Sequence, residues 1–267
     1  MDKFSVGIIG GTGGMGRWFA DFFRQGGHGV HVTGRTTGMD IPDLAMACQV
    51  IIVSVPIGVT SDVIRRVGPF LKEDALLMDL TSLKAEPVRV MLSSSTSEVI
   101  GLHPLFGPGV PSLAGQNIVL CPGRGERWFP RIRTLLEGNG ARVVVTTPER
   151  HDEMMAIVQG LNHLNTIALG LVLQEMGMKE KDLERFTTPI FRAKMEIMKR
   201  VFSRPELYAE ILTLNPHVGR ICDLYEKNLA ELCRSIKRGD AGRLRACMKE
   251  ASDLKEPIFS GKEIDSR

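Results

Sequence analysis

A histidine that could transfer a proton lies in the segment Gly101-Leu-His-Pro-Leu-Phe-Gly-Pro108. The two prolines restrict the backbone dihedral φ, and the two glycines permit sharp changes of direction. The residues just before this segment predict a short strand, which would hold His103 at its exit. An unperturbed imidazole titrates near pH ~6.5, so His103 could accept a proton at neutral pH. A histidine beside a proline in a turn can also be purely structural, so other segments must decide between the two.

A glycine-rich loop follows the first predicted strand. Residues 4–10 are an apolar, β-branched run typical of a strand buried on both faces of a parallel sheet. The pattern G-x-G-x-x-G comes next, and the apolar spacing of residues 17–24 predicts a helix. In this context the pattern indicates a dinucleotide, with its pyrophosphate on the helix N-terminus. We expect Gly11 to permit a tight turn, Gly13 to admit the pyrophosphate and Gly16 to let helix and strand pack closely. The candidate cofactor-binding residues of this loop are Gly11, Thr12, Gly13, Gly14, Met15 and Gly16.

The residues after the second predicted strand, Gly29–Thr33, bear on the choice of cofactor. A site for NAD usually ends this strand with Asp or Glu, which binds the adenosine ribose hydroxyls. Here the chain continues Gly34-Arg-Thr-Thr37, without an acid. Arg35 could bind a 2′-phosphate through two hydrogen bonds, and Thr36 could add a hydroxyl. We therefore expect NADP, with NAD as the alternative in which Arg35 only stacks on the adenine.

Strand and helix patterns alternate along the first half of the chain. Residues 50–55 and 75–80 are apolar and strand-like, and residues 60–71 between them have helical spacing. This order predicts an α/β fold with a doubly wound parallel (Rossmann) sheet, whose ligands bind at the carboxyl ends of the strands. Strands at 117–121 and 141–146, with a helix near 128–138, would complete a dinucleotide-binding domain over residues 1–150. Asp79 could contact the cofactor or cap a helix. The candidates for cofactor contact at two strand ends are Ser54, Val55, Pro56, Asp79 and Ser82.

The second half of the chain predicts an all-helical domain over residues 151–267. An almost wholly apolar helix runs from about residue 151 to Gly177. Polar residues interrupt it, and its uninterrupted apolar part is shorter than the ~20 residues that a bilayer requires, so we expect other helices to bury it. Because of these interruptions we expect no membrane contact. The remaining apolar surface suggests a symmetric homodimer. Further helices are expected from Thr188 to Arg200, at 206–214, at 218–237 and at 241–254, with a polar tail beyond Pro257.

Composition limits the class of protein. The 267 residues suffice for two modest domains, and 43% hydrophobic with 24% charged residues is typical of a soluble protein. A net charge of +3 gives no reason to expect a nucleic-acid partner. The five cysteines are scattered without C-x-x-C spacing, which argues against disulfides and against a zinc site. Because no apolar leader precedes the first strand, we expect a cytoplasmic protein. We also expect that the protein binds no metal.

Five segments occur in the order and at about the spacing of a known enzyme family: Gly10–Gly16, Asp79–Lys84, Gly101–Pro108, His151-Asp152 and Thr188–Arg192. The chain therefore resembles the prephenate/arogenate dehydrogenase family of tyrosine biosynthesis, over roughly residues 5 to 255. In particular it is similar to the dehydrogenase half of the bifunctional chorismate mutase–prephenate dehydrogenases. The segment that ends at Pro108 is the most specific match, and the glycine loop is the least specific.

The resemblance implies oxidative decarboxylation of prephenate to 4-hydroxyphenylpyruvate, with hydride transfer from ring carbon C4 to NAD(P)+. Such a site needs a base at the C4 hydroxyl, a nicotinamide over C4 and cations for two carboxylates, but no metal. His103 matches the catalytic histidine of the family, so activity should fall as pH drops through its pKa. Ser82 matches the serine that orients the histidine and the substrate hydroxyl. Prephenate and arogenate differ only in a side-chain keto or amino group, and the sequence leaves this choice open.

The resemblance also assigns substrate-binding residues in the helical half. Arg200 matches the arginine for a substrate carboxylate. Arg192, eight residues earlier on the same helix, could face the cleft as well or brace the dimer. His163 matches a histidine that lines the substrate pocket. His151, at the start of the apolar helix, is expected to be structural.

Two other classes of protein fit parts of the pattern. A hydroxyacid or imine reductase could share the two-domain plan, but it would be expected to carry a catalytic lysine in the helical domain. A non-catalytic sensor of NADP would keep the glycine loop and would not need Ser82, His103 and Arg200 together. Reduction of NADP+ in the presence of prephenate, arogenate or a hydroxyacid separates these classes.

Overall fold

The computed structural model describes residues 2–34 and 39–252. The chain forms two compact units, residues 1–218 and residues 219–267, and each is described by itself. The candidate residues described by the structure all belong to the first unit. The domain boundary at residue 150 stays a prediction from the sequence.

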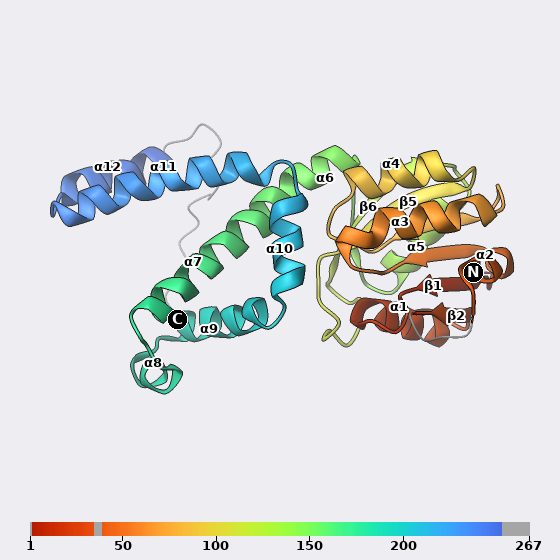
Figure 1. Cartoon of the computed structure of the whole chain (residues 1–267), viewed down its shortest axis with the longest axis horizontal. Helices are drawn as coiled ribbons and strands as arrows, with labels where there is room; N and C mark the ends of the chain where they lie inside the picture. Colours follow the sequence, from red (N-terminus) through yellow and green to blue (C-terminus); the bar gives the residue numbers. More distant parts are fainter. Residues whose placement is uncertain (1, 35–38, 253–267) are drawn as a thin grey trace. The chain divides into compact units, whose positions relative to one another are not determined.

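The first unit contains a seven-stranded sheet (Figure 1) with the strand order β2-β1-β3-β4-β5-β6-β7. All neighbouring strands are parallel except β5 and β6, which are antiparallel. The predicted Rossmann-type α/β fold is therefore confirmed as a mostly parallel sheet, and the reversal at β6 was not predicted. Residues 105–116 between β5 and β6 contain no helix, and a parallel connection would normally need such a crossover. The strands are β1 Ser5–Ile9, β2 Gly29–Thr33, β3 Val50–Val53, β4 Leu76–Asp79, β5 Glu98–Pro104, β6 Asn117–Arg124 and β7 Arg142–Val145.

Helices cover both faces of this sheet (Figure 1), and each face has its own apolar core. Phe19 of α1 and Trp128 of α5 pack in one core, while Ile64 of α3 and Met91 of α4 pack in the other. Side chains of one strand alternate between the two cores, which explains why the strands are apolar at nearly every position. The helices are α1 Gly14–Gln25, α2 Ile41–Ala47, α3 Ile57–Val67, α4 Ala85–Ser94 and α5 Trp128–Gly138, with a 3₁₀ turn at Gly68–Phe70.

The glycine loop joins β1 to α1, and its glycines have different roles. Gly10 has a φ of +83°, and the N–H groups of Gly10 and Gly11 both donate to the carbonyl of Thr33. The tight turn is therefore made at Gly10, and the prediction that Gly11 makes it was wrong. Gly11 allows close packing instead, because a Cβ there would lie 2.7 Å from Cβ of Val32. A Cβ at Gly16 would overlap the carbonyl oxygen of Gly10, as expected for close contact between helix and strand.

The helical part of the first unit begins with one long helix. It runs from Pro148 to Glu175 and consists of α6 Pro148–Met155, a π-helical turn at Ala156–Leu161, and α7 Asn162–Glu175. The hydroxyl of Thr147 caps its N-terminus by accepting from the N–H of Arg150. Thr188 caps α9 in the same way, so that helix begins at Pro189, one residue later than predicted, with the proline in its first turn as expected. The other helices are α8 Glu180–Phe186, α9 Pro189–Phe202 and α10 Pro205–Leu214.

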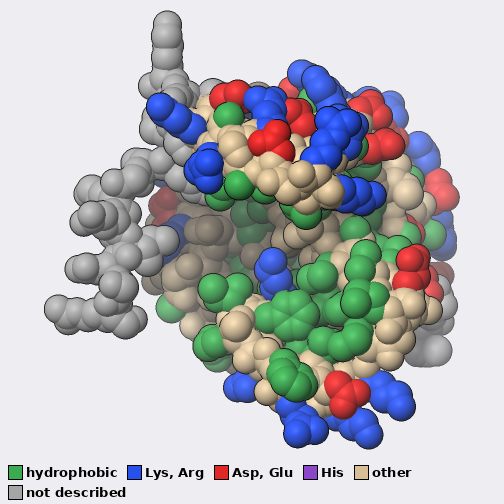
Figure 2. Space-filling view, turned by 90° about the vertical axis from the view of Figure 1, so that its left-hand side faces the viewer, with side chains coloured by type: hydrophobic (Ala, Val, Ile, Leu, Met, Phe, Trp, Pro, Cys, Tyr) green, Lys and Arg blue, Asp and Glu red, His purple; other side chains and the backbone are tan. Residues whose placement is uncertain are grey.

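The long helix Pro148–Glu175 keeps much of its apolar surface exposed. It is long and apolar enough to cross a membrane by length and composition, and 17% of its most apolar window is buried. Helices of the described part of this one chain therefore leave most of that window uncovered, and the expected burial by other helices stays a prediction. Hydrophobic side chains also gather on the face of the chain that carries α8 and α9, in the lower half of Figure 2. We name the apolar face after six exposed apolar residues on or next to α7, α8 and α9, which are Leu171, Val172, Met176, Phe186, Ile190 and Phe202.

Up to residue 252, the second unit contains two helices, α11 Val218–Lys237, whose first residue still belongs to the first unit, and α12 Ala241–Ser252. Gly239, with a φ of +68°, lies in the turn between them. Arg243 on α12 forms ion pairs with Glu231 on α11 and with Glu250 on its own helix. The predicted helix limits agree with this pair, except that the structure describes α12 only as far as residue 252.

Candidate active site

A cavity of about 510 Å³ lies at the carboxyl ends of β3, β4 and β5 in the first unit. The glycine loop forms one wall of the cavity, and the long helix, α9 and α10 contribute the others. The structure therefore brings together residues that are far apart in the sequence. The predicted site residues that line this cavity are Gly13, Gly14, Met15, Ser54, Val55, Pro56, Ser82, His103, His163 and Arg200.

A second cavity of about 780 Å³ adjoins the first and shares Gly13 and Ser54–Pro56 with it. It is lined by Gly10 and Thr12 of the loop and by Thr33 and Gly34 after β2. A Cβ at Gly13 would lie 3.3 Å from the carbonyl of Gly10, so glycine leaves room there for a ligand group. The two cavities together fit an elongated dinucleotide whose pyrophosphate lies at the N-terminus of α1. Arg35 and Thr36, predicted to bind a 2′-phosphate, lie outside the described residues.

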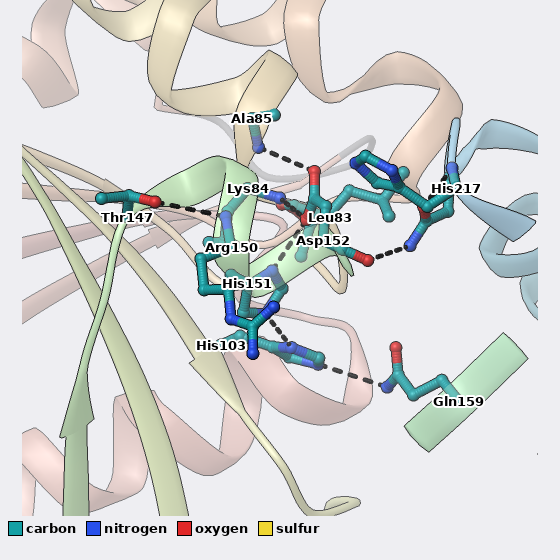
Figure 3. A network of polar contacts seen from close by, with 12 residues as sticks. Leu83, Lys84, Ala85, His103, Thr147, Arg150, His151, Asp152, Gln159 and His217 are labelled. Atoms are coloured by element: carbon teal, nitrogen blue, oxygen red, sulfur yellow. Dashed lines mark hydrogen bonds and ion pairs between the residues drawn. The ribbon is translucent and has the colours of Figure 1, made fainter. Parts of the chain in front are cut away.

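His103 lies near the end of β5, which extends to Pro104, so the strand is longer than predicted. Its Nδ1 lies 2.8 Å from Nε2 of His151, and Nδ1 of His151 lies 2.7 Å from Oδ1 of Asp152 (Figure 3). An ionised carboxylate only accepts hydrogen bonds, so Nδ1 of His151 carries the proton and donates it in a hydrogen bond to Asp152. Nε2 of His151 is then unprotonated and accepts a hydrogen bond. His103 must then donate from Nδ1. Its Nε2 is then unprotonated and accepts a long hydrogen bond, 3.5 Å, from the side-chain amide N–H of Gln159.

The surroundings keep His103 neutral. Burial lowers the pKa of His103 well below its ordinary value, and the nearby His151 and Lys84 lower it further. Burial also lowers the pKa of His151, against the opposing effect of Asp152. Lys84 is fully buried, where its ammonium forms an ion pair with Asp79 and donates to the carbonyl of Leu102. A neutral imidazole with a defined tautomer is the form that can accept a proton from a ligand hydroxyl.

The hydrogen bonds that link His103, His151 and Asp152 are named here the relay. Asp152 joins this relay to the Rossmann part of the fold. Its carboxylate accepts the backbone N–H of Lys84 at 2.8 Å and that of Ala85 at 2.9 Å, where α4 begins. Its own carbonyl accepts from the side-chain amide of Asn215 at 2.9 Å. Figure 3 shows these contacts converging on Asp152 from separate elements. The position of His151 is therefore set by contacts that also join the long helix to α4.

His163 lies further along the same helix, beyond the π-helical turn. Its ring is 4.7 Å from that of Tyr208, edge to face, and burial lowers the pKa of His163. Nδ1 of His163 and Oε1 of Gln159 are both buried without a hydrogen-bond partner in the part of the chain that the structure describes. Because both residues line the main cavity, these atoms are available to a polar ligand. π-Helical turns are frequent at functional sites.

Some predicted residues lie apart from the cavities. Asp79 is fully buried, and its carboxylate binds the N–H and hydroxyl of Thr81 and the ammonium of Lys84. It therefore positions the loop that carries Ser82, and the prediction of a cofactor contact is not supported by its geometry. Arg192 is exposed on α9 outside both cavities. Gly11 and Gly16 of the glycine loop lie against neighbouring backbone and side chains and line neither cavity.

The sequence interpretation missed part of this site. His151 was expected to be structural, although it contacts His103 directly. Gln159, Arg204 and Tyr208 also line the main cavity and were not candidates. The adjacent pair His151-Asp152 was the only local sign in the sequence that His151 could take part in the site, since a carboxylate beside a histidine can fix its tautomer.

The sheet order, the glycine loop and the adjoining cavities place the chain among the Rossmann-fold proteins that bind a dinucleotide. Residues 28–145 match the family model "Prephenate dehydrogenase, nucleotide-binding domain", and residues 147–250 match "Prephenate dehydrogenase, dimerization domain". The chain belongs to the prephenate/arogenate dehydrogenase family.

Individual relatives agree with this assignment. The chain is 36% identical over 270 residues to the "Probable arogenate/prephenate dehydrogenase" of Methanocaldococcus jannaschii, covering 94% of this chain and 60% of the relative. It is 35% identical over 212 residues to the "T-protein" of Haemophilus influenzae, covering 79% of this chain and 56% of the relative. The chain thus spans less than two thirds of the length of these relatives. The crystal structure of prephenate dehydrogenase from A. aeolicus shares the fold, with a TM-score of 0.75, 23% identity, and coverage of 94% of this chain and 96% of that one.

Proposed function

We propose that the chain oxidises and decarboxylates prephenate to 4-hydroxyphenylpyruvate, with NADP+ as the hydride acceptor and NAD+ as the alternative. The observation that carries this proposal is the orientation of His103. The hydrogen bonds from His103 through His151 to Asp152 leave Nε2 of His103 unprotonated, with a long 3.5 Å contact from the amide of Gln159. His103 and the glycine loop line the same cavity, where a base and a nicotinamide can act on the same substrate. Arogenate oxidation is the alternative within the same family.

In this proposal, different residues carry out the separate steps of the reaction. Nε2 of His103 accepts the proton of the substrate C4 hydroxyl, and Ser82 orients that hydroxyl. The bound NAD(P)+ supplies the acceptor for the C4 hydride. Arg200 holds a substrate carboxylate, so that loss of the ring carboxylate as CO2 can follow and the ring becomes aromatic. His151 and Asp152 keep His103 in the tautomer that accepts the proton.

The proposal predicts substrate-dependent reduction of NADP+. Purified protein should reduce NADP+ with prephenate and release CO2, and should give no reduction with a simple hydroxyacid. Parallel reactions with NAD+ and with arogenate decide the preferred cofactor and substrate. An imine or hydroxyacid reductase of similar plan should use a lysine, and no lysine lines the main cavity within residues 2–34 and 39–252. If NADP+ binds but neither cyclohexadiene is oxidised, the sensor interpretation replaces this one.

The pH dependence of kcat/KM should have its acid limb below pH ~6.5. The pKa of His103 is lowered from its ordinary value, so the neutral, reactive form persists into more acidic solution. We expect kcat/KM to be constant from about pH 8 to pH 6.5 and to fall only below that. Circular dichroism at each pH should establish that the protein remains folded. A limb centred at or above pH ~6.5 would contradict a buried histidine as the base.

Replacement of Arg200 with alanine should raise KM for prephenate by about 10- to 100-fold, because a hydrogen bond to a charged group contributes ~1.5–3 kcal/mol. KM for the cofactor should change little, since Arg200 lies on the helical side of the cavity. The matched control is Arg192→Ala on the same helix, which removes an arginine that lies outside the cavity. Equal increases in both KM values would rule out a specific contact with the substrate.

We also propose that two copies pair through the apolar face. The match to the dimerisation domain includes residues 147–250, and Phe186 is 86% exposed and Ile190 75% exposed. Burial of such surface in a symmetric dimer would stabilise it by the hydrophobic effect. Sedimentation equilibrium tests this proposal, and a monomer at micromolar concentration would refute it. A cytoplasmic location and the lack of a metal remain proposals from the sequence.

A further inference from the structure

Two arginine residues line the main cavity. Arg200 is in the last turn of α9, and Arg204 is the residue that precedes α10. The backbone between them turns sharply, and the N–H of Arg204 donates to the carbonyl of Val201. The junction of two helices therefore places two positive charges on one wall of the cavity. Of these two arginines, the resemblance to the family assigned Arg200 and not Arg204.

The charges of these two arginines are not neutralised by the rest of the described chain. Lys199, the neighbour of Arg200, forms ion pairs with Glu180 and Glu196. Neither Arg200 nor Arg204 forms an ion pair within residues 2–34 and 39–252. The residues that line the main cavity include no aspartate or glutamate in the described ranges. With His103 neutral, the described residues that line the cavity contribute two positively charged side chains and no negatively charged one.

The charge of the cavity distinguishes the two possible substrates. Prephenate carries two carboxylates and no cation, so its charge matches two arginines. Arogenate carries the same two carboxylates and an ammonium group. Gln159 and His163 provide neutral hydrogen-bonding atoms, which do not offset a positive charge. An ammonium group desolvated in this cavity would lack an anionic partner, which is costly.

We infer that Arg204 is a second carboxylate-binding residue. Together, Arg200 and Arg204 make the site select a dicarboxylate that has no ammonium group, so the keto acid prephenate is preferred over the amino acid arogenate. This inference rests on the proposed function and names the substrate of the same cavity. Arg200 and Arg204 each bind one carboxylate, and the lack of an acidic side chain in the cavity disfavours the zwitterionic side chain.

The test compares prephenate and arogenate as substrates of the wild type, Arg204→Gln and Arg204→Glu. The wild type should have the higher kcat/KM for prephenate. Arg204→Gln should lower kcat/KM for prephenate by about 10- to 100-fold, mostly through KM, because it loses a charge-assisted hydrogen bond. For arogenate the decrease should be smaller, since loss of Arg204 also relieves repulsion of the ammonium group. Arg204→Glu should shift the ratio of the two kcat/KM values further towards arogenate.

Controls separate the possible failures. Arg192→Gln removes an exposed arginine outside the cavity and should leave both kcat/KM values unchanged. Because the Arg204 side chain is exposed, its variants should keep the Tm of the wild type. The inference is overturned if the wild type prefers arogenate, or if Arg204→Gln leaves kcat/KM for prephenate unchanged or lowers both values equally; in these cases the proposed dehydrogenase activity stands. If the wild type oxidises neither substrate, both proposals fail.

Discussion

Replacement of His103 with asparagine lowers kcat for prephenate by about 10²- to 10⁴-fold, the range expected for the loss of a general base. Asparagine can still donate to Nε2 of His151, but its amide cannot accept a proton at neutral pH. In the proposed mode of binding, the substrate carboxylates and the cofactor contact other residues, so both KM values should change little. Steady-state kinetics with saturating NADP+ measures this separation of kcat from KM.

The matched control is His28→Asn in the Rossmann part of the fold. His28 is 7% exposed, and its Nδ1 accepts the N–H of Phe4, so it is another buried histidine with a partner. Its replacement should lower Tm without a comparable loss of kcat. A His103→Asn variant that retains kcat within a factor of about ten of the wild type would show that His103 is not the base.

The strands of the Rossmann sheet and its longer helices could be predicted because each of them has a local signal. The strand β1, the glycine loop and the strand β2 follow one another with the expected residue types. The antiparallel direction of β6 had no such signal, because direction depends on the path of residues 105–116 and not on the composition of the strand. The short helices α2, α4 and α8 were also missed, since seven to ten residues give few turns of apolar periodicity.

The site was predicted where family motifs and strand ends coincide, as at Ser82 and His103. The contact between His103 and His151 joins residues 48 positions apart, and no local pattern encodes it. A regular helix places His151 and His163 on different faces, but this estimate does not apply across the π-helical turn between them. Asp79 was misassigned because a polar residue at a strand end fits a ligand contact and a structural hydrogen bond equally well.

The largest effect expected outside the reacting groups is at His151. Replacement with leucine should lower kcat by about 10²-fold, because His103 then loses the acceptor that fixes its tautomer and orientation. Replacement with glutamine should restore most of this loss, since an amide oxygen can accept from Nδ1 of His103 near the position of the lost Nε2. Measurement of kcat for both variants at saturating prephenate tests the relay.

A purely structural role for His151 predicts a different result. Both variants leave the carboxylate of Asp152 in place, with its hydrogen bonds to the N–H groups of Lys84 and Ala85. The N-terminus of α4 therefore stays capped, and any loss of Tm reflects packing around residue 151 alone. If Tm falls to the same degree in both variants while kcat falls only with leucine, the hydrogen bond to His103 is what supports catalysis. Equal values of kcat in the two variants would show that His151 acts only by filling space, and the tautomer of His103 would then need another cause.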